Sequence, residues 1–439
     1  MTHRGSRVLR VGSLSRVEGE GALHLRVHGG RVSEARLQIY EPPRFFEAFL
    51  RGRAYTEPPD ITARVCGICP VAYQMSACAA VEDACGVSVG GQLAELRRLL
   101  YCGEWIESQT LHIYLLHAPD FLGCVSVIDL ARTHRADVER GLRLKQTGNA
   151  LMELLGGRAI HPVNVRVGGF HRAPTREELR PLYERLKRAM DDAWATVRWV
   201  SRFDFPDAAC DEDFFALSEA GRYAIAAGTP TVLPGDGGPQ RAFPVRDFSE
   251  HVVERQVPHS TGLQSELDGR RHLTGSLARY AINGRLLSPP ARQAAREAGL
   301  GPVCRNPFRS IVVRAVEVLY AIDEAMRIID AYERPPRPSV EVPPRAGTGH
   351  GATEAPRGLL YHRYTLDADG TVTDARLVPP TAQNQGAIEE DLRRLVQGAM
   401  DDGDPGDTEL TALCERVIRN HDPCISCSTH FLELTVERV

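Results

Sequence analysis

The sequence predicts a mainly helical α+β protein, in which a central bundle of long helices carries small antiparallel sheets at its edges. Two observations lead to this fold class. Apolar residues recur with helical spacing over long stretches, at residues 69–85, 92–117, 125–155 and 175–203. Alternating apolar and polar residues, which are typical of half-buried strands, occur only in shorter segments.

The first half of the chain divides into two regions. Residues 1–60 predict an N-terminal β region, because residues 8–39 alternate in polarity around a Gly29-Gly30 turn. Residues 61–203 predict a helical core. Its last helix is expected to begin at Thr175, since Thr175-Arg176-Glu177-Glu178 has the pattern of a capping box.

The second half returns to the helical core after a different segment. Residues 204–274 are richer in glycine, proline and short strands, and we expect a peripheral lobe there. Residues 275–439 predict further helices, at 306–332 and 388–399, a hairpin at 359–377 and a C-terminal metal-binding segment. We expect all four regions to form a single domain, residues 1–439.

Composition excludes several classes of protein. The chain has 439 residues, 43% of them hydrophobic and 25% charged, with a formal net charge of −4, as in an ordinary globular protein that does not bind nucleic acid. No apolar run approaches the roughly 18 residues that a transmembrane helix needs. The N-terminal residues do not form the apolar core of a secretion signal. We therefore expect a cytoplasmic location and no transmembrane segment.

Four of the eleven cysteines form two Cys-x-x-Cys pairs, Cys66 with Cys69 and Cys424 with Cys427. This spacing lets two sulfurs bind one metal ion. A zinc ribbon would place its second pair about 15–20 residues after the first, whereas these pairs lie near opposite ends of the chain. Spacing alone leaves open a catalytic transition-metal site, a structural zinc site and an iron–sulfur site.

The residues around the cysteines narrow these alternatives. Arg-x-Cys-Gly-x-Cys at 64–69 and Asp-Pro-Cys-x-x-Cys-x-x-His at 422–430 resemble the nickel-binding motifs of nickel–iron hydrogenase large subunits. The segments 15–19 (SRVEG), 156–162 (GGRAIHP) and 353–358 (TEAPRG) are similar to further motifs of that family. The segments 305–310 and 381–385 resemble its cytoplasmic branch, which includes NAD(P)-linked enzymes and sulfhydrogenases.

The resemblance implies a nickel–iron centre held by the four thiolates. Cys66 and Cys424 would be terminal nickel ligands, while Cys69 and Cys427 would bridge nickel and iron. The family's iron also carries carbon monoxide and cyanide, which accessory maturation proteins must supply. Soft thiolate ligands suit such a centre.

The same resemblance implies reversible, heterolytic cleavage of hydrogen, with three residues in catalytic roles. Cys424 would accept the first proton, and Glu18 would pass it onward. Arg357 would place a permanent positive charge over the open metal position.

Other residues match less central positions of the family. Glu47 and His430 correspond to residues that hold a magnesium or iron ion near the C terminus. Asp422 is expected to orient Arg357 and the Cys424 loop. We interpret His112 and His117 as buried core histidines.

Several partners follow from the family. The chain has no further cysteine cluster to carry electrons away, so we expect an iron–sulfur small subunit, and beyond it flavin and iron–sulfur subunits that exchange electrons with NAD(P). Family precursors are often cut after the last motif, so an endopeptidase that removes Phe431–Val439 is a further hypothesis.

Three other functions remain possible at this point. The chain could be a hydrogen sensor with the same site, which sequence distinguishes poorly from an enzyme. It could be a quinone-pocket subunit of a respiratory complex, although these usually lack the four cysteines. It could also be a zinc scaffold, which would leave Glu18 and Arg357 unexplained.

Overall fold

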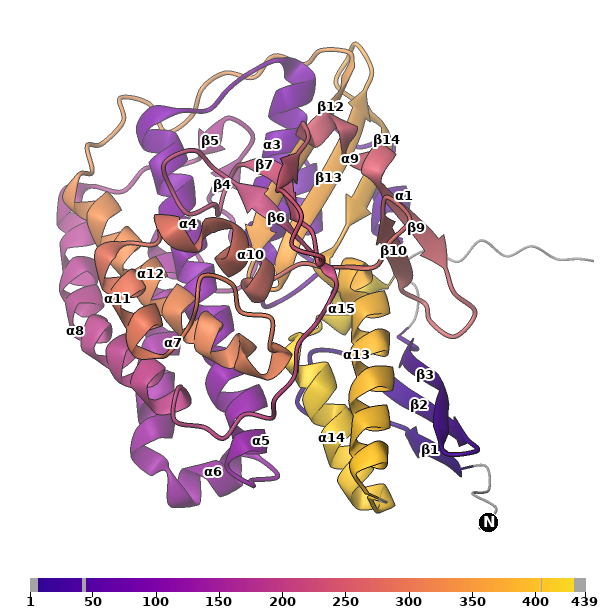
Figure 1. Cartoon of the computed structure of the whole chain (residues 1–439). Coiled ribbons are helices and arrows are strands. Elements are labelled where there is room, and N and C mark those ends of the chain that lie inside the picture. Colours follow the sequence, from indigo (N-terminus) through magenta and orange to yellow (C-terminus); the bar gives the residue numbers. More distant parts are fainter. Residues whose placement is uncertain (1–6, 42–44, 404, 430–439) are drawn as a thin grey trace, which may run out of the picture.

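The computed structural model describes residues 7–41, 45–403 and 405–429. Long helices pack side by side and small sheets lie around them (Figure 1), which confirms the predicted fold class. Helix α4 packs against both α7 and α12, and α8 packs against both of these. The long helices in the first three quarters of the chain are α3 (Pro70–Cys85), α4 (Gly91–Leu111), α7 (Arg135–Gly156), α8 (Arg176–Val200) and α12 (Ser310–Asp330).

Local sequence signals explain where these helices begin and end. The predicted capping box is present before α8: the Glu178 amide donates to the Thr175 hydroxyl at 3.3 Å, and the Thr175 amide donates to Glu178 at 2.7 Å. The helix predicted at 92–117 is α4 followed by a π-helical segment, His112–His117. The helix predicted at 125–155 is wrong in one respect: it breaks at His134, which leaves the helical region (φ −129°, ψ 44°) between α6 (Val127–Thr133) and α7.

The N-terminal sheet has the predicted antiparallel order, β1 (Arg7–Val11), β2 (Gly21–His28) and β3 (Arg31–Ile39). It packs against α13 (Pro380–Asp402) and α14 (Asp407–Asn420). The predicted helix at 388–399 is therefore too short, and α14 was not predicted. Leucine and valine side chains of β2 and β3 share a buried apolar cluster with these two helices.

Residues 204–274 contain the short strands that their composition predicted. A mixed sheet runs in the order β11-β6-β7-β8, and a separate antiparallel pair joins β9 to β10. The division of the chain into four regions of one domain stays a prediction. The strands are β6 (Asp213–Ser218), β7 (Thr229–Leu233), β8 (Arg241–Ala242), β9 (Val252–Gln256), β10 (Leu263–Leu267) and β11 (His272–Leu273).

A three-stranded antiparallel sheet reaches the centre of the molecule. Strands β13 (Gly358–Leu366) and β14 (Val372–Val378) confirm the predicted hairpin, but β12 (Gly347–Ala355) was not predicted. Alternate glycines of β12 lie directly against the backbone of α3. A Cβ atom on Gly349 would lie 2.0 Å from the Ala80 carbonyl oxygen, and one on Gly351 would lie 2.3 Å from the Ser76 carbonyl oxygen.

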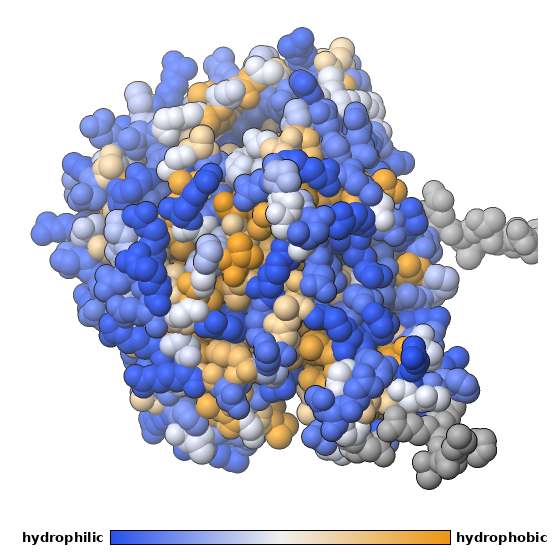
Figure 2. All heavy atoms as spheres, in the orientation of Figure 1, coloured by the Kyte–Doolittle hydropathy of each residue, from blue (hydrophilic) through white to orange (hydrophobic). Residues whose placement is uncertain are grey.

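Within the described residues, no helix is both long enough and apolar enough to cross a membrane. The face in Figure 2 is largely hydrophilic, with scattered apolar areas.

Shorter elements connect the helices and sheets described above. They are α1 (Phe46–Leu50), α2 (Pro58–Thr62), α5 (Ala118–Phe121), β4 (Val165–Arg166), β5 (Gly169–Phe170), α9 (Phe248–His251), α10 (Ser276–Asn283), α11 (Pro289–Glu297), α15 (Ile425–Ser428) and short 3₁₀ turns at Val245–Asp247, Gly284–Leu286 and Pro307–Arg309.

Candidate metal centre

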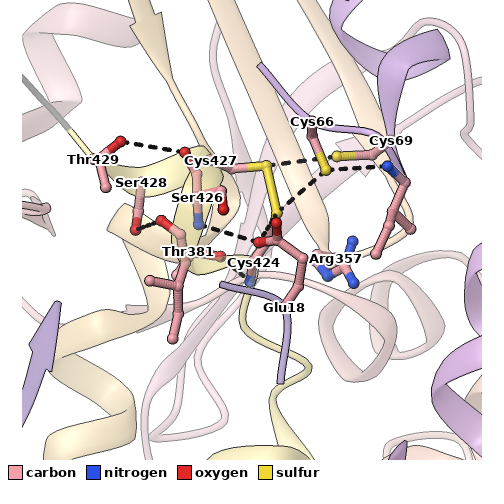
Figure 3. Close-up of a disulfide and its surroundings, with 12 residues drawn as sticks. Glu18, Cys66, Cys69, Arg357, Thr381, Cys424, Ser426, Cys427, Ser428 and Thr429 are labelled. Carbon is pink, nitrogen blue, oxygen red and sulfur yellow. Dashed lines mark hydrogen bonds between the residues drawn. A yellow bond between two sulfur atoms is a disulfide. The ribbon is translucent and has the colours of Figure 1, made fainter. Parts of the chain in front are cut away.

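The structure brings the two cysteine pairs together. The four sulfur atoms lie within 4.8 Å of one another, and all four residues are buried. Cys66 lies 3.5 Å from Cys424 and Cys69 lies 3.7 Å from Cys427, measured between Sγ atoms (Figure 3). Among the described residues, this is the one group of at least three His, Cys, Asp or Glu side chains with metal-ligand spacing.

The first pair is held at the start of α3. Pro70 occupies the first turn of this helix, where its missing N–H is not needed. The Glu104 carboxyl group of α4 accepts the next two amides, from Val71 at 2.6 Å and Ala72 at 3.1 Å. Burial raises the pKa of Glu104 well above its usual range. Sequence reasoning missed this residue, which fixes the turn that carries Cys69.

The second pair lies on α15 and the residue before it. The Cys424 amide donates to the Thr381 hydroxyl at 2.9 Å, which ties the loop to α13. Asp422 has a positive φ of 51°, so the chain turns sharply just before the pair. Cys424 and Cys427 are joined as a disulfide (Figure 3). A metal ion binds thiolates, so the reduced pair is the form that can act as a ligand.

Glu18 contacts the second pair directly. One carboxylate oxygen lies 3.0 Å from the Cys424 sulfur, which can donate to it once the pair is reduced, and accepts from the Ser426 amide at 3.1 Å. The Glu18 backbone also pairs with this loop, since its carbonyl accepts from the Ile425 amide at 3.0 Å. A Cβ atom on Gly19, which has φ +84°, would lie 2.9 Å from the Ile425 Cβ. The glycine after Glu18 therefore allows the two chain ends to meet closely.

Arg357 also lies beside the cysteines, at the turn between β12 and β13 (Figure 3). Its Nε atom donates to the Asp422 carbonyl at 3.0 Å and lies 3.3 Å from the Asp422 carboxylate. The Nη1 and Nη2 atoms are buried and have no hydrogen-bond partner among the residues that the structure describes. Burial opposes the charge, but Asp422 and the cysteines raise the pKa of Arg357, which therefore stays cationic.

The thiols of Cys66 and Cys69 differ in pKa. A hydrogen bond from Cys69 lowers the pKa of the Cys66 thiol, and the nearby positive charge of Arg357 also lowers it. The same hydrogen bond, together with burial, raises the pKa of Cys69 well above its usual range. Cys66 is thus the more readily ionised of the two.

Comparison with protein families matches residues 44–142 and 281–430 to the nickel-dependent hydrogenases. The chain belongs to this family. It is 33% identical to the alpha chain of sulfhydrogenase 2 of Pyrococcus furiosus, over 97% of this chain and 100% of the relative. It is 26% identical to a chain of the vhc F420-non-reducing hydrogenase of Methanococcus voltae, over 96% of this chain and 94% of the relative.

Solved structures agree with this membership. An NAD+-reducing [NiFe]-hydrogenase in the H2-reduced state superposes with a TM-score of 0.86 at 28% identity, covering 97% of this chain and 99% of the other. The NiFeSe hydrogenase of Desulfomicrobium baculatum gives a TM-score of 0.75 at 20% identity, over 97% and 100% of the two chains, which shows a shared fold. The chain is thus the large subunit of a nickel–iron hydrogenase, which is an oxidoreductase that acts on hydrogen.

The residues of this hydrogenase fit a nickel–iron group. Four sulfurs without oxygen or imidazole ligands are a soft donor set, which suits nickel and iron with strong-field ligands. The terminal guanidinium nitrogens of Arg357, which have no partner within the described part of the chain, are buried donors beside these sulfurs. Buried donors are rarely left unpaired, and an anionic ligand of the metals would satisfy them.

Other sequence-predicted residues of this hydrogenase lie nearby or outside the described part. Glu47, on α1, accepts from the Leu377 amide at 2.7 Å and lines a pocket together with Cys427 and Thr429. His430 and the tail Phe431–Val439 lie outside the described residues, so the predicted second metal ion and the predicted cleavage stay predictions.

The two histidines of the π-helical segment are buried, as predicted. His112 contacts the Arg419 carbonyl oxygen at 2.8 Å, and His117 contacts the Asn420 side-chain oxygen at 2.9 Å. Burial lowers the pKa of both imidazoles well below the usual range, so both are neutral. They support the segment that leads into Asp422.

Proposed function

We propose that this large subunit cleaves and forms hydrogen at a nickel–iron centre bound by Cys66, Cys69, Cys424 and Cys427. The observation that carries the proposal is the convergence of four buried sulfurs, a carboxylate and a guanidinium from distant parts of the chain. When bound, the metals supply the Lewis acidity and the change of oxidation state that hydrogen cleavage requires.

In this proposal, Cys424 and Glu18 move the proton. The 3.0 Å contact between the Cys424 sulfur and the Glu18 carboxylate is within the range for direct proton transfer. The Ser426 amide donates to the same carboxylate oxygen and fixes its direction. Glu18 can therefore receive a proton from the reduced Cys424 thiol without rearrangement.

Arg357 has an electrostatic role in this proposal. Its Nε–H donates to the Asp422 carbonyl. The two terminal nitrogens have no partner among the described residues, so they remain available to other groups in the site. A fixed cation that needs no reorganisation stabilises negative charge on the metal ligands, and in a buried site such an interaction is strong. Terminal nitrogen donors can also bind the cyanide ligands that the family carries on iron.

Glu47 is proposed to hold a magnesium or ferrous ion together with His430. Its place in a pocket lined by Cys427, Ser428 and Thr429 supports this assignment, since these residues directly precede position 430. Hard oxygen donors such as a carboxylate suit magnesium.

We also propose that the immediate electron acceptor is an iron–sulfur small subunit. In the described part of the chain there is a single cysteine cluster, and the remaining described cysteines are scattered singly. Electrons released at the centre therefore need a carrier from another chain. The similarity to an NAD+-reducing [NiFe]-hydrogenase supports flavin-containing partners and NAD(P) as a further acceptor.

Infrared spectroscopy of the purified complex, with nickel and iron analysis, tests the centre. Bands from metal-bound carbon monoxide and cyanide are expected in the wild type and not in the Cys424→Ser variant. Hydrogen consumption with a dye acceptor is expected to be lost in the same variant, whereas Cys414→Ser, a change at a buried cysteine remote from the cluster, keeps both signals. A Cys424→Ser enzyme with wild-type turnover would refute the proposal.

A further inference from the structure

The turn that carries Arg357 is held by a second buried arginine. Arg279, on α10, donates to the two backbone carbonyls directly before Arg357: Nη1 to Ala355 and Nη2 to Pro356, each at 2.9 Å. The preceding carbonyl, of Glu354, accepts from the indole nitrogen of Trp105 at 2.9 Å. Three consecutive carbonyls leading to Arg357 are thus bound by buried side-chain donors.

Arg279 is itself fixed in place. Glu317 of α12 binds it through two hydrogen bonds, at 2.7 Å to Nε and 2.8 Å to Nη2. Its guanidinium carbon lies 4.5 Å from the centre of the Trp105 ring. Nη1 also lies 3.3 Å from the Glu354 carboxylate. Arg279 and Glu317 are both fully buried, so water does not compete for these charge-assisted hydrogen bonds.

Glu317 and Glu354 connect the arginine to the surrounding elements. The Glu317 carboxylate accepts from the Tyr223 hydroxyl at 2.8 Å, and the Glu354 carboxylate accepts from the Leu217 amide at 2.6 Å. Helix α10 packs against both α12 and β6, and β6 in turn packs against β12 and β13. The position of the turn is therefore set by the helical core and not by solvent.

The geometry of the turn transmits this constraint to the guanidinium of Arg357. Pro356 and Arg357 are the two residues between paired Ala355 and Gly358, which makes this a two-residue hairpin loop. Gly358 has φ +138°, and a Cβ atom on Gly275 would lie 3.0 Å from the Arg357 carbonyl oxygen. The backbone of Arg357 is thus packed closely against that of Gly275, which restricts where its side chain begins.

We propose that Arg279 is a positioning residue for the hydrogenase reaction, and that it holds the Arg357 turn so that the Arg357 guanidinium faces the four cysteines. This inference rests on the proposed role of Arg357. The turn has no comparable donor if Arg279 is replaced by lysine, because an ammonium group cannot reach two carbonyls and a bidentate carboxylate at once.

The test compares Arg279→Lys with a matched control, Arg97→Lys. Arg97 forms a similarly buried bidentate pair, with Glu82 at 2.6 and 2.8 Å, but binds the Arg166 carbonyl instead of the Arg357 turn. At equal nickel content, we expect turnover of Arg279→Lys to fall about 10- to 100-fold, since a shift of about 1 Å at a reacting centre costs that much. Arg97→Lys is expected to keep turnover within about twofold.

Infrared bands give a readout other than activity. If the guanidinium of Arg357 moves, the cyanide bands of Arg279→Lys shift in the direction seen for Arg357→Lys, whereas those of Arg97→Lys stay in place. The double variant Arg279→Lys/Arg357→Lys is expected to be no slower than Arg357→Lys alone, because residues that act through one group are not additive. Wild-type bands and turnover in Arg279→Lys would overturn the inference.

Further variants separate the possible failures. Wild-type turnover in Arg357→Lys would contradict the proposed role of Arg357 itself, whereas a slow Arg357→Lys beside a wild-type Arg279→Lys would refute only the positioning role. If Arg279→Lys does not fold, Glu317→Gln replaces it, because this change keeps the side-chain shape and weakens the grip on Arg279. Glu317→Gln should lose less turnover than expected for Arg279→Lys, and its cyanide bands should shift in the same direction. Unchanged cyanide bands in Glu317→Gln would overturn the inference.

Discussion

Replacing Glu18 by glutamine removes the proton acceptor that contacts Cys424 while it keeps the shape of the side chain. The glutamine oxygen can still accept from the Ser426 amide, now 3.1 Å from the carboxylate, so the loop around Cys424 should stay in place. The loss of one charge-assisted hydrogen bond costs about 1 kcal/mol of folding stability. Metal content and infrared bands are therefore expected to match the wild type.

Turnover is expected to respond much more strongly than stability. A positioned acid or base contributes about 10²- to 10⁴-fold, and the amide cannot accept the proton from the Cys424 thiol at 3.0 Å. We expect a loss of that size in hydrogen oxidation with a dye acceptor. A parallel loss is expected in the exchange of deuterium gas with solvent protons, because both processes need the same proton exit.

Glu41→Gln is the matched control for this experiment. The Glu41 carboxylate accepts from the Ser426 hydroxyl at 3.0 Å and from the Glu20 amide at 2.7 Å, so it supports the same loop through a hydroxyl and an amide instead of a thiol. Its glutamine variant is expected to stay within about tenfold of the wild type. A metal-loaded Glu18→Gln enzyme with wild-type exchange and turnover would refute the proton-transfer role.

Three further predictions concern the assembly of the site and its stability. Gly19→Ala places a methyl group 2.9 Å from the Ile425 Cβ, on a residue with φ +84°, so we expect the variant to lose roughly 2 kcal/mol or more of folding stability and to bind nickel poorly. Thermal unfolding and metal analysis measure these effects, and wild-type values for both would contradict the prediction. Glu104→Ala leaves two amides at the start of α3 without their acceptor, which should cost about 2 kcal/mol and lower the nickel content, and a fully loaded variant of unchanged stability would contradict this. Burial alone would raise the pKa of Glu324, but hydrogen bonds from Arg327 and Arg98 lower it to about 2. The ionised Glu324 carboxylate therefore contributes on the order of 3 kcal/mol to folding stability above about pH 4.5, and this contribution is lost as the pH falls towards 2. The stability difference between wild type and Glu324→Gln should shrink over that range. A constant difference would show that the interaction of Glu324 with the two arginines is not responsible.

Sequence alone could predict which residues form the candidate site, because each of them lies in a recognisable local pattern. The two Cys-x-x-Cys pairs, Glu18 and Arg357 each lie in a short motif, and the structure brings all of them to one place. The predicted helix boundaries around Thr175 and Cys85 also follow local rules, a capping box at one and a left-handed glycine after the other.

The supporting residues could not be predicted in the same way. Glu104 and Arg279 are single charged residues on helices, a pattern that normally indicates a solvated surface. Their roles arise only when distant carbonyls or amides are packed against them. Strand β12 was missed because Gly347, Gly349 and Gly351 have low strand propensity, although their spacing of two residues places them on one face.

The contact between these glycines and α3 sets the spacing of two elements that lead to the candidate site. Helix α3 begins beside Cys69, and β12 runs along it towards Arg357, with Gly349 and Gly351 in direct contact with the Ala80 and Ser76 carbonyls. An added methyl group at either glycine would push β12 and α3 apart. Substitutions far from any metal ligand would thereby widen the gap between the guanidinium and the thiolates.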